Sequence, residues 1–159
     1  DKTTQGPAML RTRLTDALKT AMKSKDAKST ATLRLILAAL KDRDIAARSK
    51  GNRATISDDE VLGMLQSMIK QRRESIALYE KGGRMELAQQ EAEEIAVIEE
   101  FLPEQMGADK MASVIDAIIT ESEAASLKDM GRVMAALKEN HAGSMDFSKA
   151  SALVKERLG

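Results

Sequence analysis

Apolar side chains recur at helical spacing in the middle of the chain and predict a long helical hairpin. Residues 57–60 (Ser-Asp-Asp-Glu) suit a helix start, because the serine can cap and the acids favour the positive helix end. An apolar stripe follows at Val61, Leu62, Leu65, Met68, Ile69, Ile76 and Tyr79. After a break at residues 82–83 (Gly-Gly), a second stripe runs through Leu87, Ala88, Ala92, Ile95, Ile98 and Leu102 until Pro103. The pattern predicts two antiparallel helices joined by a short glycine turn.

One charged residue lies within each apolar stripe of this hairpin. Arg72 falls between Met68 and Ile76, and Glu91 falls in the middle of the second stripe, with Glu94 at its edge. Counted outward from the glycine turn, Arg72 and Glu91 lie at similar distances. We therefore expect them to meet, since a half-buried guanidinium needs a carboxylate to offset its desolvation. Such a pair would fix the register of the two helices, and a functional role for it is the alternative.

Two more helices are predicted before the hairpin, over residues 9–23 and 27–48. The segment 33–40 is apolar nearly all round, as expected of the central helix of a bundle. Residues 49–55 have no periodicity and predict a loop. A four-helix bundle is therefore expected over residues 9–103. Residues 1–8, polar with a Gly-Pro step, look like a remnant of recombinant expression and are left out of the fold prediction.

A smaller subdomain of three short helices is expected over residues 108–159. Its helices are predicted to start near Asp109, at Ser126 and at Asp146. The predicted fold class is thus all-α, an N-terminal helical bundle with a long hairpin followed by a three-helix subdomain. Many Ala, Leu, Met, Glu and Lys residues and the near absence of aromatic residues agree with a helical protein.

The middle helix of the small subdomain has an unusual polar face. Its apolar side chains, expected to point inward together, are Leu127, Met130, Val133, Met134 and Leu137. Gly131 and Ala135 are expected to project outward, flanked by Lys128, Arg132 and Lys138. Glycine within a helix costs about 1 kcal/mol relative to alanine, so it calls for a reason. A small-residue surface rimmed by cations would let another backbone approach; helix packing within the same protein and binding of RNA or protein both remain open.

Charge is balanced over the whole chain but not along it. Residues 9–56 carry 12 basic and 4 acidic side chains, residues 57–107 carry 5 and 12, and residues 108–159 carry 7 and 8. The split favours attraction between the first two segments as they fold, and it also leaves open a basic outer face on the N-terminal helices.

Residues for catalysis or metal binding are scarce. Cysteine is absent and His141 is the only histidine, so thiolate sites are excluded and a zinc site is not expected. No phosphate-binding loop or nucleophile motif is present, and the acids near Glu91 predict a solvated face. We expect no catalytic residue, no metal and no cofactor. No apolar run could cross a bilayer, and the composition is compatible with the cytoplasm.

Several motifs in order resemble the GatB/YqeY family. They are residues 69–75 (Ile-Lys-Gln-Arg-Arg-Glu-Ser), 79–84 (Tyr-Glu-Lys-Gly-Gly-Arg), 93–103 (Glu-Glu-Ile-Ala-Val-Ile-Glu-Glu-Phe-Leu-Pro) and 128–134 (Lys-Asp-Met-Gly-Arg-Val-Met). The resemblance extends from Met9 to Gly159 and implies an all-helical, two-part fold. Such YqeY-like proteins are similar to the C-terminal tail of the B subunit of glutamine-dependent aminoacyl-tRNA amidotransferase, a tail that helps to hold the tRNA.

The resemblance implies a non-catalytic module that binds tRNA or is associated with the amidotransferase. On the matching positions, Lys128, Gly131 and Arg132 are the expected RNA-facing residues, and Ala135 stands where a second small residue, often glycine, is usual. Lys138 and basic residues of the second helix such as Arg34 and Lys41 are further candidates for contacting tRNA. The alternative is an adaptor that docks a partner helix on the Gly131 and Ala135 face. Carbon–nitrogen ligase activity with glutamine as nitrogen donor is a more remote, inherited alternative.

Overall fold

The structure, a computed structural model, describes residues 9–51 and 55–159. Within these ranges it contains seven α-helices, one 3-10 turn and no strand, which confirms the all-α prediction. The chain divides into two compact units, Asp1–Leu102 and Pro103–Gly159. The remnant expected at residues 1–8 lies outside the described residues, as does the centre of the loop predicted at residues 49–55.

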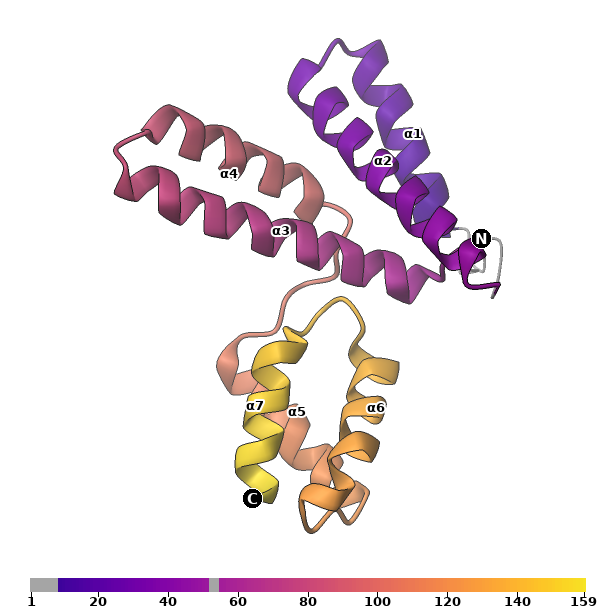
Figure 1. The fold of residues 1–159 in the computed structure, drawn as a ribbon, viewed down its shortest axis with the longest axis vertical. Helices are drawn as coiled ribbons and strands as arrows, with labels where there is room; N and C mark the ends of the chain where they lie inside the picture. Colours follow the sequence, from indigo (N-terminus) through magenta and orange to yellow (C-terminus); the bar gives the residue numbers. More distant parts are fainter. Residues whose placement is uncertain (1–8, 52–54) are drawn as a thin grey trace. The chain divides into compact units, whose positions relative to one another are not determined.

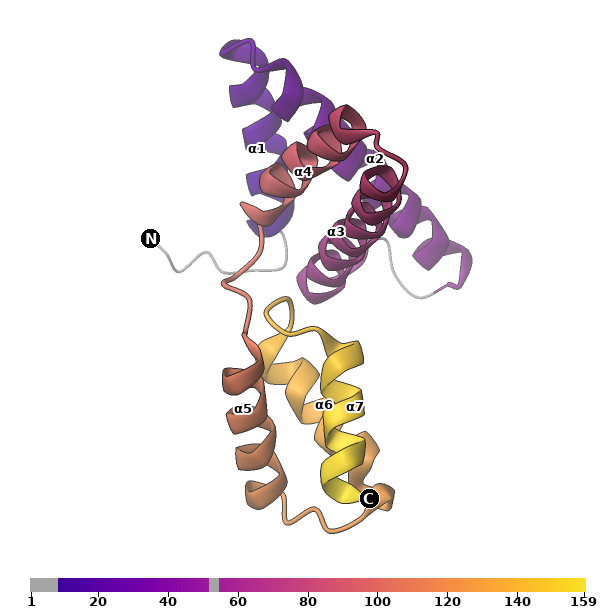
Figure 2. The same cartoon turned by 90° about the vertical axis from the view of Figure 1, so that its left-hand side faces the viewer.

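The first unit consists of two helical hairpins (Figures 1 and 2). Helices α1 (Met9–Lys23) and α2 (Ala27–Ser49) form one, and α3 (Asp58–Lys81) and α4 (Met85–Glu99) form the other. The hairpins pack together chiefly through α2 against α4, with α1 also touching α3. Their shared core is formed by apolar side chains, and its most deeply buried members are Leu14, Ile36, Val61, Met64, Leu65 and Ile98. Thr32 and Asp44 are buried polar residues of the same unit.

Local hydrogen bonds and a glycine turn set the helix ends in this unit. Asp26 caps α2 by accepting a hydrogen bond from the Ser29 backbone N–H, and Ser57 and Glu60 form a reciprocal capping box at the start of α3. The turn between α3 and α4 places Gly83 at φ +75°, a conformation that favours glycine. The predicted helix, glycine turn and second helix are therefore confirmed.

The ion pair across the α3–α4 hairpin differs from the prediction by one helical turn. The Arg72 guanidinium Nε donates to the Glu94 carboxylate over 2.9 Å, and its Nη1 donates to the Met68 carbonyl over 3.1 Å. Glu91, the predicted partner, makes no ion pair with Arg72. The turn explains the error: α3 ends at its C-cap Gly82 and α4 starts after its N-cap Arg84, so Arg72 and Glu94 lie equally far from their caps.

The second unit packs three helices around a small apolar core. These are α5 (Ala108–Glu121), α6 (Met130–His141) and α7 (Phe147–Leu158), with a 3-10 turn, η1 (Leu127–Asp129), leading directly into α6. Its fully buried side chains are Ile115, Val133, Leu137, Met145, Ala150 and Val154. Asp146 caps α7 as predicted, by accepting hydrogen bonds from two backbone N–H groups.

Leu127 does not join the inward-facing stripe that the sequence predicts for α6. It is 49% exposed, whereas Val133 and Leu137 are fully buried. Residues 127–129 form a 3-10 turn with about three residues per turn, so extrapolating the α-helical period back to Leu127 misplaces its side chain.

Candidate functional site

The face predicted to bind RNA or a partner lies on η1 and α6 of the second unit. We define the α6 outer face as Lys128, Gly131, Arg132, Ala135 and Lys138, all of which are exposed. The opposite side of α6 is held in the core by Val133 and Leu137. The predicted outward orientation of these five residues agrees with the structure.

The start of α6 is fixed by a dense set of hydrogen bonds. The Asp129 carboxylate accepts backbone N–H groups from Ala125 over 2.8 Å and Ser126 over 3.3 Å, and the Ser126 hydroxyl accepts the Lys128 N–H. The hydrogen bond from Ala125, and then that from Arg132, hold the pKa of the Asp129 carboxyl below its usual value. The position of Lys128 thus depends on a well-anchored turn.

The Arg132 side chain makes hydrogen bonds within its own unit, which the sequence did not predict. Its guanidinium donates from Nη2 to Asp129 over 2.8 Å and from Nη1 to the Ser122 carbonyl at the end of α5. The side chain is still half-exposed. Arg132 therefore links α6 to the chain after α5, and only part of its donor capacity remains for a ligand.

Gly131 and the two lysines of the α6 outer face are unobstructed. A Cβ added to Gly131 would meet no heavy atom within 4 Å. Among the described residues, 9–51 and 55–159, neither Lys128 nor Lys138 makes a side-chain hydrogen bond or an ion pair. Lying ten residues apart on nearly continuous helix, they are separated along its axis by about 15 Å. Between them the backbone at Gly131 and Ala135 is open to close approach.

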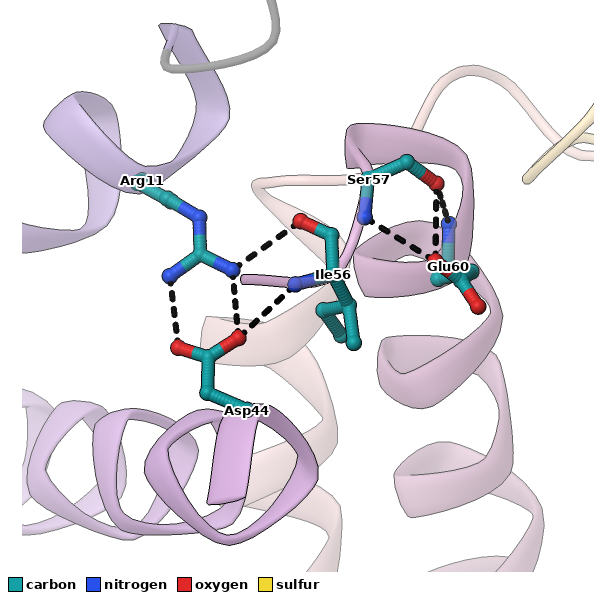
Figure 3. Close-up of polar contacts among 5 residues, drawn as sticks. All are labelled: Arg11, Asp44, Ile56, Ser57 and Glu60. Atoms are coloured by element: carbon teal, nitrogen blue, oxygen red, sulfur yellow. Dashed lines mark hydrogen bonds and ion pairs between the residues drawn. The ribbon is translucent and has the colours of Figure 1, made fainter. Parts of the chain in front are cut away.

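A second polar cluster, in the first unit, joins α1, α2 and the start of α3 (Figure 3). The Arg11 guanidinium donates two hydrogen bonds to the Asp44 carboxylate, over 2.7 and 2.9 Å, and a third to the Ile56 carbonyl. Asp44 also accepts the Ile56 N–H over 2.9 Å. The side chains of Arg11 and Asp44 are only 22% and 12% exposed, so the ion pair is largely shielded from solvent.

This cluster is structural, although its ionisable groups are perturbed. The hydrogen bond from Arg11, partly opposed by burial and supported by the Ile56 N–H, lowers the pKa of the Asp44 carboxyl. Perturbed carboxyls often mark functional sites, but here both carboxylate oxygens are engaged by groups of the same protein. Nothing in the cluster is directed at a ligand.

The described residues, 9–51 and 55–159, contain neither a cluster suited to a metal ion nor a helix suited to crossing a membrane. No group of three or more His, Asp or Glu residues there is arranged to hold a metal ion. Nor does any helix among residues 9–51 and 55–159 combine the length and the apolar character that crossing a bilayer requires.

Comparison with known proteins places the whole helical array in one family. The sequence pattern of the YqeY-like protein family matches residues 11–158. The chain belongs to this family. The match runs from the first turn of α1 to the last residue of α7, so the matched region of this chain includes both the Arg11–Asp44 cluster and the α6 outer face.

A relative in fission yeast is similar over much of its length. The protein described as uncharacterized protein C22F3.15 of Schizosaccharomyces pombe is 32% identical over 97 residues, which cover 61% of this chain and 72% of the yeast protein. Its name assigns no activity.

Proposed function

We propose that the chain is a non-catalytic helical module that binds tRNA, or works with a tRNA-dependent amidotransferase, through the α6 outer face. The observation that carries the proposal is the open backbone at Gly131 between two unpaired lysines, Lys128 and Lys138. A sugar-phosphate chain can approach such a backbone closely, and lysines at both ends supply charge for its phosphates.

The anchored turn before α6 supports this proposal. A binding surface is more effective when its side chains are held in place before the ligand arrives. Asp129 and Ser126 fix the turn that carries Lys128, and the bond from Arg132 to Asp129 secures the next turn. Arg132 contributes mainly by positioning its neighbours, with its remaining donors available to phosphates.

A salt-titrated gel shift with total tRNA tests the proposal. We expect Lys128→Glu/Lys138→Glu to weaken binding at least tenfold and to lower the slope of log affinity against log salt by about two, one for each lost phosphate contact. Arg132 is left unchanged because replacing it would also break the helix start.

The matched control is Lys149→Glu/Lys155→Glu on α7, which makes the same charge change on exposed positions of the same unit. Equal weakening by both double variants would mean that net charge alone drives binding. Absence of any shift at low salt would refute the tRNA proposal.

Filling the small-residue surface provides an independent prediction. Gly131→Leu should leave the second unit at least as stable as the wild type, because the site is open and glycine disfavours helix by up to about 1 kcal/mol. The leucine would nevertheless hold a sugar-phosphate chain away from the backbone, so we expect about a tenfold loss of tRNA affinity, equivalent to about 1.4 kcal/mol. Thermal unfolding and the same gel shift measure the two effects, and unchanged affinity would contradict close approach at Gly131.

A second candidate function is an adaptor that docks a partner helix on the Gly131 and Ala135 face. Leu127 lies beside this face and is 49% exposed. It favours the adaptor hypothesis, because an apolar side chain can be buried by a partner helix but makes no favourable contact with phosphates. On this hypothesis binding would depend only weakly on salt and would fail with Gly131→Leu, whereas Lys128→Glu/Lys138→Glu would have little effect.

A further inference from the structure

Helix α2 in the first unit has a long outer face that nothing in the unit covers. Its inner side is buried through Leu33, Ile36 and Leu40. On the opposite side small or apolar residues recur at seven-residue intervals and are exposed: Ala31, Ala38 and Ile45. We call this line the α2 seam.

One edge of the α2 seam carries a row of cations with the same interval. Arg34, Lys41 and Arg48 each follow a seam residue by three positions, which places them about 10 Å apart along the helix. Over residues 9–51 and 55–159, Arg34 and Lys41 make no side-chain hydrogen bond or ion pair. Arg48 continues the row and also acts electrostatically on buried Asp44.

The other edge of the seam is partly apolar. Leu35 is 48% exposed there and, with Ile45 of the seam at 46%, gives the face two large apolar side chains. Ala31, Leu35, Ala38 and Ile45 follow the three-and-four spacing by which one helix packs along another, with Asp42 at the one polar position of the series. In such packing the flanking cations pair with acids of the partner helix.

We propose that the α2 seam docks an acidic amphipathic helix of a partner protein. The partner's apolar side chains cover Leu35 and Ile45, and its acids, spaced seven residues apart, pair with Arg34 and Lys41. The row spans about 20 Å, so roughly four turns of partner helix are enough to engage it.

Two other occupants fit this face less well. A nucleic-acid backbone would pair with the cations but would leave Leu35 and Ile45 uncovered. A second copy of α2 has no acidic row to offer, since Asp42 is the exposed acid of this helix and Asp44 is buried. Charge complementarity therefore favours an acidic partner.

A synthetic helix serves as the probe. It is a fluorescent 21-residue peptide with leucine along one face and glutamate at both flanking positions, and its counterpart has lysine in place of every glutamate. Fluorescence anisotropy with the full chain should show binding of the acidic peptide only. We expect Arg34→Glu/Lys41→Glu to weaken that binding at least tenfold, and Leu35→Asn/Ile45→Asn to weaken it by a similar factor.

Lys19→Glu/Lys23→Glu on α1 is the charge-matched control, because both lysines are exposed in the same unit and lie on a different helix from the seam. It should bind the acidic peptide like the wild type. Failure of the acidic peptide to bind, or equal weakening by the control, overturns the proposal. Loss of tRNA binding in Arg34→Glu/Lys41→Glu without loss of peptide binding would instead assign the row to nucleic acid. The peptide-binding outcomes do not bear on the α6 outer face, which the tRNA gel shift tests separately.

Discussion

Replacing Asp44 by alanine is expected to lower the free energy of unfolding of the first unit by about 3 kcal/mol. The substitution removes both hydrogen bonds from Arg11 and the one from the Ile56 N–H. The Arg11 guanidinium then stays largely buried without a counter-charge, which is the costly way to break an ion pair. The cluster also joins α1, α2 and the entry to α3, so its loss loosens three segments together.

Tyrosine fluorescence during urea unfolding measures this effect on the first unit alone. Tyr79 in α3 is the only tyrosine and the chain has no tryptophan. Arg73→Ala is the control, because it breaks an exposed ion pair with Glu99, and such pairs contribute about 0–1 kcal/mol. Equal destabilisation by the two variants would show that the Arg11–Asp44 cluster has no special role.

The pH dependence of the free energy of unfolding at acid pH provides a second test of the role of Asp44. Because Arg11 lowers the pKa of the folded Asp44 carboxyl, the ionised group stabilises the fold at pH values above its unfolded-state pKa of about 4. That contribution is lost as the pH falls from there through the folded pKa. The wild type should therefore lose stability below about pH 4 more steeply than Asp44→Ala.

The helices and their ends were predictable from the sequence because their signals are local. The capping box at Ser57, the glycine turn and the Asp146 cap each need only a few neighbouring residues. Pairings across helices were less predictable. Arg72 pairs with Glu94 and not with the predicted Glu91. The register of the two helices depends on where α3 ends and α4 begins at the turn, and the hydrophobic periodicity does not define these ends.

The sequence pattern places Asp44 on a buried stripe, but it does not identify Arg11 as its partner. Asp44 continues the buried stripe of Leu33, Ile36 and Leu40 at helical spacing, just as Arg72 interrupts the stripe of α3. A charge on a buried stripe predicts a partner, but the partner, Arg11, comes from another helix and its identity depends on packing. On the α6 outer face the exposed positions were predictable, whereas the tie from Arg132 to the end of α5 depends on the path of the chain after Glu121.

Replacing Leu137 by alanine is expected to unfold most of the second unit while leaving the first intact. Leu137 is fully buried, and large-to-small changes at such sites cost about 2–5 kcal/mol. A core of this size, without disulfide or metal, supplies only about 3–5 kcal/mol, so a single cavity removes most of its stability. The α6 outer face would then be lost although none of its own residues had changed.

Hydrogen exchange of the full chain measures this outcome helix by helix. We expect backbone amides of α5, α6 and α7 to lose protection in Leu137→Ala, while the urea midpoint reported by Tyr79 stays at its wild-type value. Leu127→Ala is the matched control, since the same substitution at an exposed site of the same unit opens no cavity. A parallel fall of the Tyr79 midpoint would show that the two units unfold as one. In that case a variant that weakens the core beneath α6 would also alter the α2 seam, so only surface substitutions could assign binding to either face.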